Sequence, residues 1–346
     1  KEIPAFKPDL YQDYIQFLNR IEEEHALNYW ANYLEGTSHG TFLPFINNES
    51  ERNKGLGDYK TASLELTPNI SKEILQFAQS NRLTLNTVMQ GVWAELLHRY
   101  TGSSDVIFGT IVSGRPDDLQ GVEKRVGMYI NTLPMRSVKG DENKTTKWLS
   151  TLQTEQVNSR QYQYTPLHKI QNAIKVQGDL FDTLFVFENY PVSSVVNEKQ
   201  WSLKVSNAEM HEQTNYPITI LVNAQETINI SLHYNTALID EKVIQTLIGH
   251  LEQVVIQIHN VETTSEIEIL TQEENDQIAN FNNTEKQYPA NQTVLDLIKE
   301  QTKNTPNNKA LIFEEEHISY KELDELTNTI AKNLIQKGVK ENSMVP

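Results

Sequence analysis

Two kinds of apolar segment alternate along residues 59–259 of this 346-residue chain. Short runs rich in Val, Ile, Leu and Phe have the length of strands, and the longer segments between them carry apolar residues at helical spacing. The predicted strands are residues 59–66, 106–112, 126–133, 183–188, 202–205, 218–223 and 228–233. Because strands and helices interleave, the sequence predicts an α/β fold of layered (α+β) architecture.

The helical segments carry recognisable ends. Residues 8–35 predict one or two helices, Ser71 is a candidate N-cap, and the helix that starts at Leu85 is predicted to close near Gly102. Further predicted helices are residues 148–163, 166–174 and 240–259. His98 lies on the helix that starts at Leu85, and we interpret it as a surface or packing residue.

Composition excludes several classes of function. The chain has no cysteine, so neither a disulfide scaffold nor a thiolate metal site is possible. A net charge of −16 argues against nucleic acid as a partner, since phosphate binding needs clustered Lys and Arg. There is no apolar run of roughly 18 residues and no charged-then-apolar leader, so we expect neither a membrane span nor a signal peptide. These features predict a soluble, cytoplasmic protein.

Two of the predicted strands end in polar, conformationally special residues. The run 106–112 leads into Ser113-Gly114-Arg115-Pro116, and the run 126–133 ends in Asn131-Thr132-Leu133-Pro134. Binding residues favour loops that a rigid scaffold holds in place, so this pair is a candidate site. Ordinary turn chemistry between two strands is the alternative.

Several segments carry a family resemblance. VGMYINTLPMR (126–136), preceded by FGTIVSGRP (108–116), resembles the condensation domain of non-ribosomal peptide synthetases. YQDY (11–14), YQYTPLHKIQ (162–171) and FDTLFVFENYP (181–191) follow the family's order. The resemblance implies a chloramphenicol acetyltransferase-like lobe with a mixed β-sheet flanked by helices. It also implies the formation of an amide bond between donor and acceptor thioesters carried by carrier proteins.

The catalytic signature of that family is missing. It consists of two adjacent histidines followed three residues later by Asp-Gly, and none of the nine histidines here is adjacent to another. Because the first residue is Lys1 and the Tyr-x-Asp segment comes almost at once, we expect residues 1–261 to be a C-terminal lobe without the catalytic lobe. We therefore assign no catalytic residue, no metal and no cofactor to this chain. Phosphopantetheine is expected on partner carrier domains, and the N-terminal lobe is expected as a further partner.

The resemblance names candidate site residues. Asn131 is the leading one, because its amide offers donors and an acceptor to a thioester or amide. Ser113 is a candidate for contacts near the acceptor amine, and Thr132 belongs to the same run. For Arg115 and Arg136 structural pairing is favoured, whereas Gly114 and Gly127 are assigned a shape role. Loop and interface architecture is expected of Tyr11, Asp13, Tyr164, Glu188, Asn189 and Tyr190.

The composition changes after residue 261. Residues 262–292 are rich in acid, Asn and Gln with little periodicity, which predicts a linker. In residues 293–346, Ser319 and Glu322 form a capping box before a helix that Gly338 ends. This stretch resembles the start of an adenylation domain, with Ile318 where that family usually has Leu. The remainder of that domain is an expected partner, and the parent enzyme would use ATP and Mg²⁺.

Three functions remain open on the sequence. The first is the acceptor-side lobe of a condensation enzyme in peptide antibiotic or siderophore biosynthesis. The second is a non-catalytic scaffold or docking module for carrier proteins. The third is a stand-alone coenzyme A-dependent acyltransferase, which would need a catalytic histidine motif of its own.

Overall fold

The computed structural model describes residues 11–37, 39–46, 52–116, 118–140, 144–174, 176, 178–188, 214–288 and 290–345. The chain divides into two compact units, Lys1–Asp276 and Gln277–Pro346. Each unit is described by itself.

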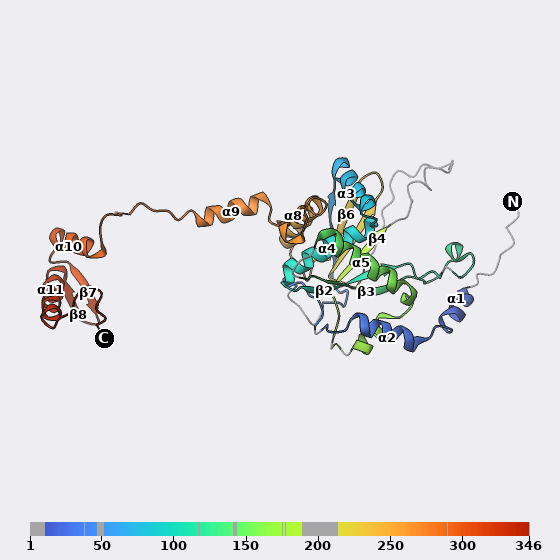
Figure 1. Cartoon of the computed structure of the whole chain (residues 1–346), viewed down its shortest axis with the longest axis horizontal. Coiled ribbons are helices and arrows are strands. Elements are labelled where there is room, and N and C mark those ends of the chain that lie inside the picture. Colours follow the sequence, from blue (N-terminus) through green and yellow to red (C-terminus); the bar gives the residue numbers. More distant parts are fainter. Residues whose placement is uncertain are drawn as a thin grey trace. The chain divides into compact units, whose positions relative to one another are not determined.

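A six-stranded mixed sheet forms the centre of the first unit (Figure 1). Its strands are β1 (Tyr59–Glu65), β2 (Asp105–Val112), β3 (Asn131–Val138), β4 (Thr183–Glu188), β5 (Ile218–Ala224) and β6 (Ile228–Asn235). They lie in the order β1-β6-β5-β4-β2-β3. The central pairs β4–β5 and β4–β2 are parallel, and the outer pairs are antiparallel. The mixed sheet flanked by helices confirms the predicted fold class; the predicted strand 202–205 lies outside the described residues.

Helices cover both faces of the sheet around β2. The larger buried cluster contains side chains of α3 (Pro68–Ser80), α4 (Leu85–Thr101), α5 (Thr145–Ser159) and α8 (Glu241–Gln257) together with Val106 and Phe108 of β2. Ile107 points to a second cluster, with Trp30 of α2 (Glu23–Tyr33) and Ile170 of α6 (Leu167–Ile174). Because successive side chains of a strand point to opposite faces, β2 is buried on both sides. It is therefore a rigid support for whatever follows Val112.

Helix α4 begins and ends where the sequence predicts. The hydroxyl of Thr84 accepts from the backbone N–H of Thr87, and Gly102 ends the helix in the left-handed conformation with φ +67°. The N-cap prediction for Ser71 is wrong. Thr67 caps α3 with Pro68 in the first turn, and Ser71 is buried inside the helix, where its hydroxyl accepts from Ile228 N at 3.0 Å.

The start of the predicted linker belongs to the first unit. The short 3₁₀-helix η4 (Thr264–Glu266) packs near α4, and Lys144 pairs with Thr263 in an isolated antiparallel bridge. Further on, α9 (Gln272–Asn282) begins before the boundary between the units and has no buried residue. A segment without apolar periodicity is thus ordered here by backbone and polar contacts together with the burial of Ile267, which is 2% exposed.

The second unit is small and carries much apolar surface. It contains α10 (Val294–Asn304), the hairpin β7 (Lys309–Phe313) and β8 (Glu316–Ser319), and α11 (Tyr320–Gln336). The predicted capping box is confirmed, since Ser319 N donates to Glu322 Oε2 at 2.8 Å and Glu322 N to Ser319 Oγ at 3.3 Å. No side chain of α10 or α11 is buried.

Candidate functional site

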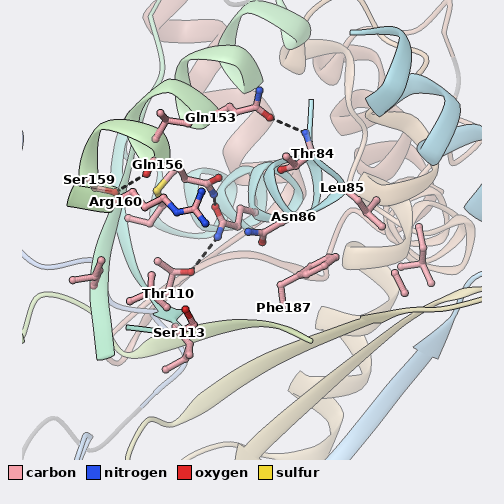
Figure 2. A pocket seen from close by; sticks show the side chains of 18 of the residues that line it. Thr84, Leu85, Asn86, Thr110, Ser113, Gln153, Gln156, Ser159, Arg160 and Phe187 are labelled. Atoms are coloured by element: carbon pink, nitrogen blue, oxygen red, sulfur yellow. Dashed lines mark hydrogen bonds between the residues drawn. The ribbon is translucent and has the colours of Figure 1, made fainter. Parts of the chain in front are cut away.

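A cavity of about 830 Å³ opens where β2 ends and β3 begins (Figure 2). Ser113 and Leu133, from the two strand-end segments that the sequence singles out, both line it. Apolar side chains from five elements complete the wall: Leu75, Leu85, Val157, Phe187 and Ile228 among them. The predicted convergence of the two strand ends at one site is therefore present, and its volume is that of a small-molecule pocket.

The wall of the cavity also contains a chain of amide and hydroxyl groups. Gln90, which is only 1% exposed on α4, donates through Nε2 to Thr110 Oγ1 of β2 at 3.1 Å. Gln156 of α5 donates through Nε2 to Gln90 Oε1, and Thr87 Oγ1 lies 3.2 Å from Gln156 Oε1. This chain connects α4, α5 and β2, so it fixes the shape of the polar part of the wall.

Asn131 does not line this cavity. Its side-chain Nδ2 donates to the carbonyl oxygens of Gln163 at 2.8 Å and Thr165 at 2.9 Å, so both amide hydrogens are used on the backbone. The contact joins the start of β3 to the turn before α6. It thereby positions β3, whereas the direct contact with reacting groups that we expect of Asn131 has no support in this geometry.

Gly114 and Gly127 have the shape role predicted for them. Gly114 is buried with φ +60°, and a Cβ there would lie 1.8 Å from the carbonyl oxygen of Tyr129. A Cβ on Gly127 would lie 2.3 Å from the ring of Tyr11. Both glycines therefore permit a close approach, within the loop for Gly114 and between the loop and α1 (Tyr11–Leu18) for Gly127. Thr132 takes part in the ladder opposite Ile111 and is not among the residues that line the cavity.

The two arginines make structural contacts, as favoured from the sequence. Arg115 donates to the carbonyl oxygens of Val122 and Arg125 and lies over the ring of Tyr129 at 4.3 Å. Arg136 contacts both carboxylate oxygens of Asp105, at 2.9 and 2.8 Å, and donates to the carbonyl of Tyr33 at 2.8 Å. Each guanidinium joins chain segments, and neither lines the cavity.

The remaining predicted residues divide into three groups. Tyr11 donates to Met128 O at 2.7 Å, Asp13 pairs with Arg125 at 3.0 Å, and Tyr164 meets Phe17 edge to face. These three fasten the loop between β2 and β3, or the turn before α6, to α1. Glu188 ends β4 opposite Asn223, outside the cavity. Asn189 and Tyr190 lie outside the described residues.

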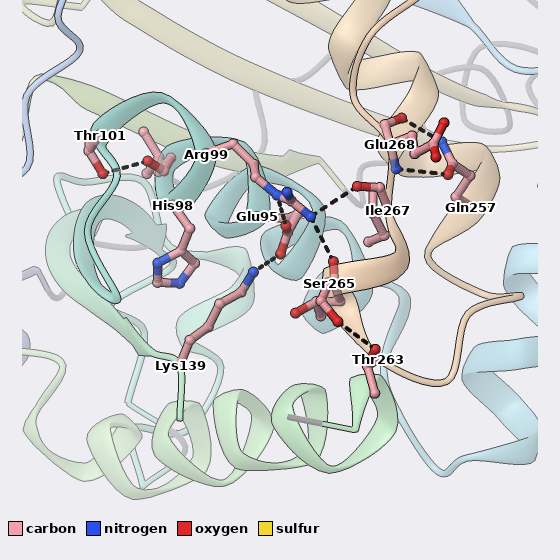
Figure 3. A network of polar contacts seen from close by, with 12 residues as sticks. Glu95, His98, Arg99, Thr101, Lys139, Gln257, Thr263, Ser265, Ile267 and Glu268 are labelled. Atoms are coloured by element: carbon pink, nitrogen blue, oxygen red, sulfur yellow. Dashed lines mark hydrogen bonds and ion pairs between the residues drawn. The ribbon is translucent and has the colours of Figure 1, made fainter. Parts of the chain in front are cut away.

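Buried charge elsewhere in the unit is structural (Figure 3). Glu95 of α4 is fully buried between Arg99, at 2.8 Å, and Lys139. Arg99 also donates to the carbonyl oxygens of Thr264 at 3.0 Å and Ile267 at 2.9 Å, so the pair anchors the segment after α8.

His98 packs in the interior, which agrees with its interpretation as a packing residue. It is 6% exposed, its Nδ1 lies 2.7 Å from Ser103 O, and its Nε2 lies 3.0 Å from Ser137 Oγ. Burial lowers the pKa of His98 to about 4. Of the histidines that the structure describes, none lines the cavity. In the part of the chain that the structure describes, no three His, Asp or Glu side chains gather as a metal site, and no helix is long and apolar enough to cross a membrane.

Sequence reasoning missed the glutamines of the cavity. Gln90 lies between Met89 and Gly91 in a buried, mostly apolar stretch of α4, and a polar residue in this stretch is a signal that the sequence does contain. Gln153 and Gln156 lie on α5 among polar neighbours, where nothing in the sequence distinguishes them.

Comparison with known proteins gives consistent results. A family model described as "Condensation domain" matches residues 1–279. The chain is 35% identical to tyrocidine synthase 2 of Brevibacillus parabrevis over 96% of its length and 10% of that protein. It is 32% identical to bacitracin synthase 3 of Bacillus licheniformis, covering 100% of this chain and 6% of that protein. The chain therefore spans a tenth or less of the length of these two relatives.

Solved structures share the fold at low sequence identity. A four-domain nonribosomal peptide synthetase bound to AMP and glycine superposes with a TM-score of 0.74 and 16% identity, covering 98% of this chain and 27% of that one. The first condensation domain of the CDA synthetase gives a TM-score of 0.62 and 14% identity, covering 78% of this chain and 59% of that one. Together with the family match, these results show that the chain belongs to the condensation-domain family of nonribosomal peptide synthetases.

Proposed function

We propose that residues 1–276 form the acceptor-side half of a condensation domain, which joins donor and acceptor carrier-bound thioesters through an amide bond. The observation that carries the proposal is the cavity at the ends of β2 and β3, with Ser113 on its wall. An acceptor aminoacyl group fits a pocket of this volume, and apolar walls with a few fixed polar groups are what holds such a ligand in one orientation.

The chemistry needs a proton acceptor that this half does not supply. The attacking amine must be neutral, and the charged tetrahedral intermediate must be stabilised. Neither a histidine nor a lysine is among the described residues that line the cavity, and no two histidines of the sequence are adjacent. The proposal is therefore that a second lobe supplies the histidine motif. The chain's share of 59% of the solved CDA condensation domain supports this division.

An exposed apolar ridge supports a lobe partner beside the loop between β2 and β3. Val126, Met128 and Ile130 are 81%, 85% and 66% exposed, although the loop that carries them is held by Tyr129, which is 2% exposed. A rigid loop that presents three large apolar side chains to solvent is typical of an interface. We assign this ridge to the partner lobe, and the open mouth of the cavity to the phosphopantetheine arm of a carrier domain.

Residues 293–346 are proposed to begin an adenylation domain. The superposition with the first condensation domain of the CDA synthetase covers 78% of this chain. The superposition with the four-domain synthetase, which contains further domains, covers 98% of it. The apolar side chains of Leu311, Ile312 and Phe313 on β7 are exposed by 51%, 69% and 75%, which supports the rest of that domain as their cover. ATP and Mg²⁺ would act only in the complete domain.

A substitution that fills the cavity tests the acceptor site. Val157 lines the cavity from α5 with 65% exposure, so Val157→Trp fills space without removing a core contact. We expect the complete parent synthetase to need at least about tenfold more acceptor carrier for half-maximal single-turnover condensation. Thr154→Trp, on the same helix but outside the cavity, is the control. An unchanged requirement in the Val157 variant, with its fold intact, contradicts the proposal.

A further inference from the structure

We infer that Thr110 determines which acceptor side chain the cavity prefers, by donating its hydroxyl proton to a carbonyl oxygen on that side chain. The inference deepens the proposed function and rests on it. Thr110 lies on β2, is half-buried, and lines the cavity three residues before Ser113 (Figure 2).

The direction of the hydrogen-bond chain is what assigns this role. Gln156 Nε2 donates to Gln90 Oε1, which leaves the Nε2 of Gln90 to donate to Thr110 Oγ1 at 3.1 Å. A hydroxyl has one proton and two lone pairs, and Gln90 occupies one lone pair. Among the residues that the structure describes, no group accepts the Thr110 proton. The chain therefore ends in a donor at the cavity.

Burial makes this donor selective. Gln90 is 1% exposed and its carboxamide is held at both ends, so it cannot turn to accept from Thr110 without breaking the bond to Gln156. Successive bonds of one direction polarise each other, which strengthens the final donor. A ligand that covers the hydroxyl of Thr110 without accepting its proton forfeits a hydrogen bond, whereas a carbonyl oxygen satisfies it.

The rest of the wall combines apolar side chains, which limit the size of the ligand, with further polar ones such as Asn86, Ser113 and Gln163. Leu85, Leu133 and Phe187 present apolar surface. Among the described residues that line the cavity, the charged ones are Arg160 and Glu226, both exposed. The ligand class that fits is an aminoacyl group with an apolar stem and a carbonyl oxygen near its end, such as a carboxamide side chain. Gln90 and Gln156 are positioning residues, because they act through Thr110.

Binding of two probes of the same shape tests the inference. Asparaginyl- and leucyl-pantetheine amides differ mainly in the side-chain carbonyl and amino groups. Glutaminyl- and homoleucyl-pantetheine amides form a second pair, in which each side chain has one more methylene. In calorimetric titration of the 346-residue chain, we expect the carboxamide probe of at least one pair to bind about five to ten times more tightly than its apolar partner.

Variants then separate the hydroxyl from the cavity itself. Thr110→Val keeps the β-branched shape and should reduce the ratio within the pair to about one, whereas Thr110→Ser should retain it. Gln156→Met, which removes the donor that orients Gln90, should lower the ratio by about threefold and serves if the valine variant fails to fold. Thr154→Val, on the outer side of α5, is the matched control and should not change the ratio.

The outcomes distinguish the inference from the proposed function. If no probe binds the wild-type chain, the assignment of the cavity to an acceptor group fails, and the inference with it. If the probes of each pair bind equally, or if Thr110→Val leaves the ratio unchanged, only the role of Thr110 is overturned. A lower ratio in Thr110→Val, with the ratio retained in Thr110→Ser, supports it.

Discussion

Replacement of Gly114 by alanine tests how the loop beside the cavity is held. The residue combines two demands, a φ of +60° and a backbone contact that leaves no room for a Cβ. A left-handed conformation costs an alanine about 1–2 kcal/mol. The added Cβ would lie 1.8 Å from Tyr129 O, so the two backbone segments must also separate, and such overpacking costs about 1–3 kcal/mol.

The expected loss is therefore about 2–5 kcal/mol of unfolding free energy. Gly102 provides the matched control, because its φ is +67° and no atom lies within 4 Å of its would-be Cβ. Gly102→Ala should lose only the conformational part, about 1–2 kcal/mol. The difference between the two variants isolates the close approach to Tyr129.

Urea denaturation followed by tryptophan fluorescence measures this difference. All four tryptophans precede Gln277, so the signal reports on the first unit alone. Movement of Tyr129 should also disturb its contacts with Arg115, at 4.3 Å, and Tyr14, at 4.6 Å. If Gly114→Ala loses no more stability than Gly102→Ala, the loop does not depend on this contact and the reasoning is refuted.

Two further predictions concern buried ionisable groups. Glu95→Gln should destabilise the first unit by about 3 kcal/mol and increase hydrogen exchange at residues 262–268, because Arg99 and Lys139 lose their buried partner. Glu252→Gln, exposed on α8, is the control. Equal hydrogen exchange in the two variants would show that the pair of Glu95 and Arg99 does not hold the segment after α8. Burial lowers the pKa of His98 from 6.5 to about 4 in the folded state. Between these two pH values the unfolded chain binds the proton and the folded chain does not, so the free energy of unfolding should fall as the pH decreases from about 6.5 towards 4. His98→Gln should lack that component in pH-dependent urea titrations, and a variant with the wild-type pH slope would show that His98 is not its source.

Local signals of the sequence determined much of the first unit. The helix over Leu85–Thr101 follows from a threonine cap, an apolar face and a terminal glycine, all of which act within a few residues. The strand over Thr183–Glu188 has the predicted bounds, because a short run of β-branched and aromatic residues between turn signals has few alternatives. The sequence also singled out two strand ends of which Ser113 and Leu133 line the cavity.

Only the tertiary structure decided where β3, the second of the two strands beside the cavity, begins. Residues 126–133 have an apolar pattern that predicts a strand, yet β3 starts at Asn131, opposite Val112. The residues before Asn131 belong to the loop because Gly127 packs against Tyr11, which is more than a hundred residues away in sequence. Apolar side chains before Asn131 thus become an exposed ridge instead of a strand.

Contacts between distant parts of the chain also decided what the side chain of Asn131 binds. An amide at a strand end can bind a ligand or the backbone, and nothing in the sequence distinguishes these two possibilities. In the fold, Asn131 Nδ2 lies within 2.9 Å of the carbonyl oxygens of Gln163 and Thr165 and donates to both. Gln90, Gln156 and Thr110 come from two helices and a strand, and their chain of hydrogen bonds exists only once these pack. The sequence by itself determined the family and the elements, through local periodicity and motifs. The partners of each polar group were decided by the tertiary structure, because hydrogen bonds form between groups that are close in space and the sequence records only their order.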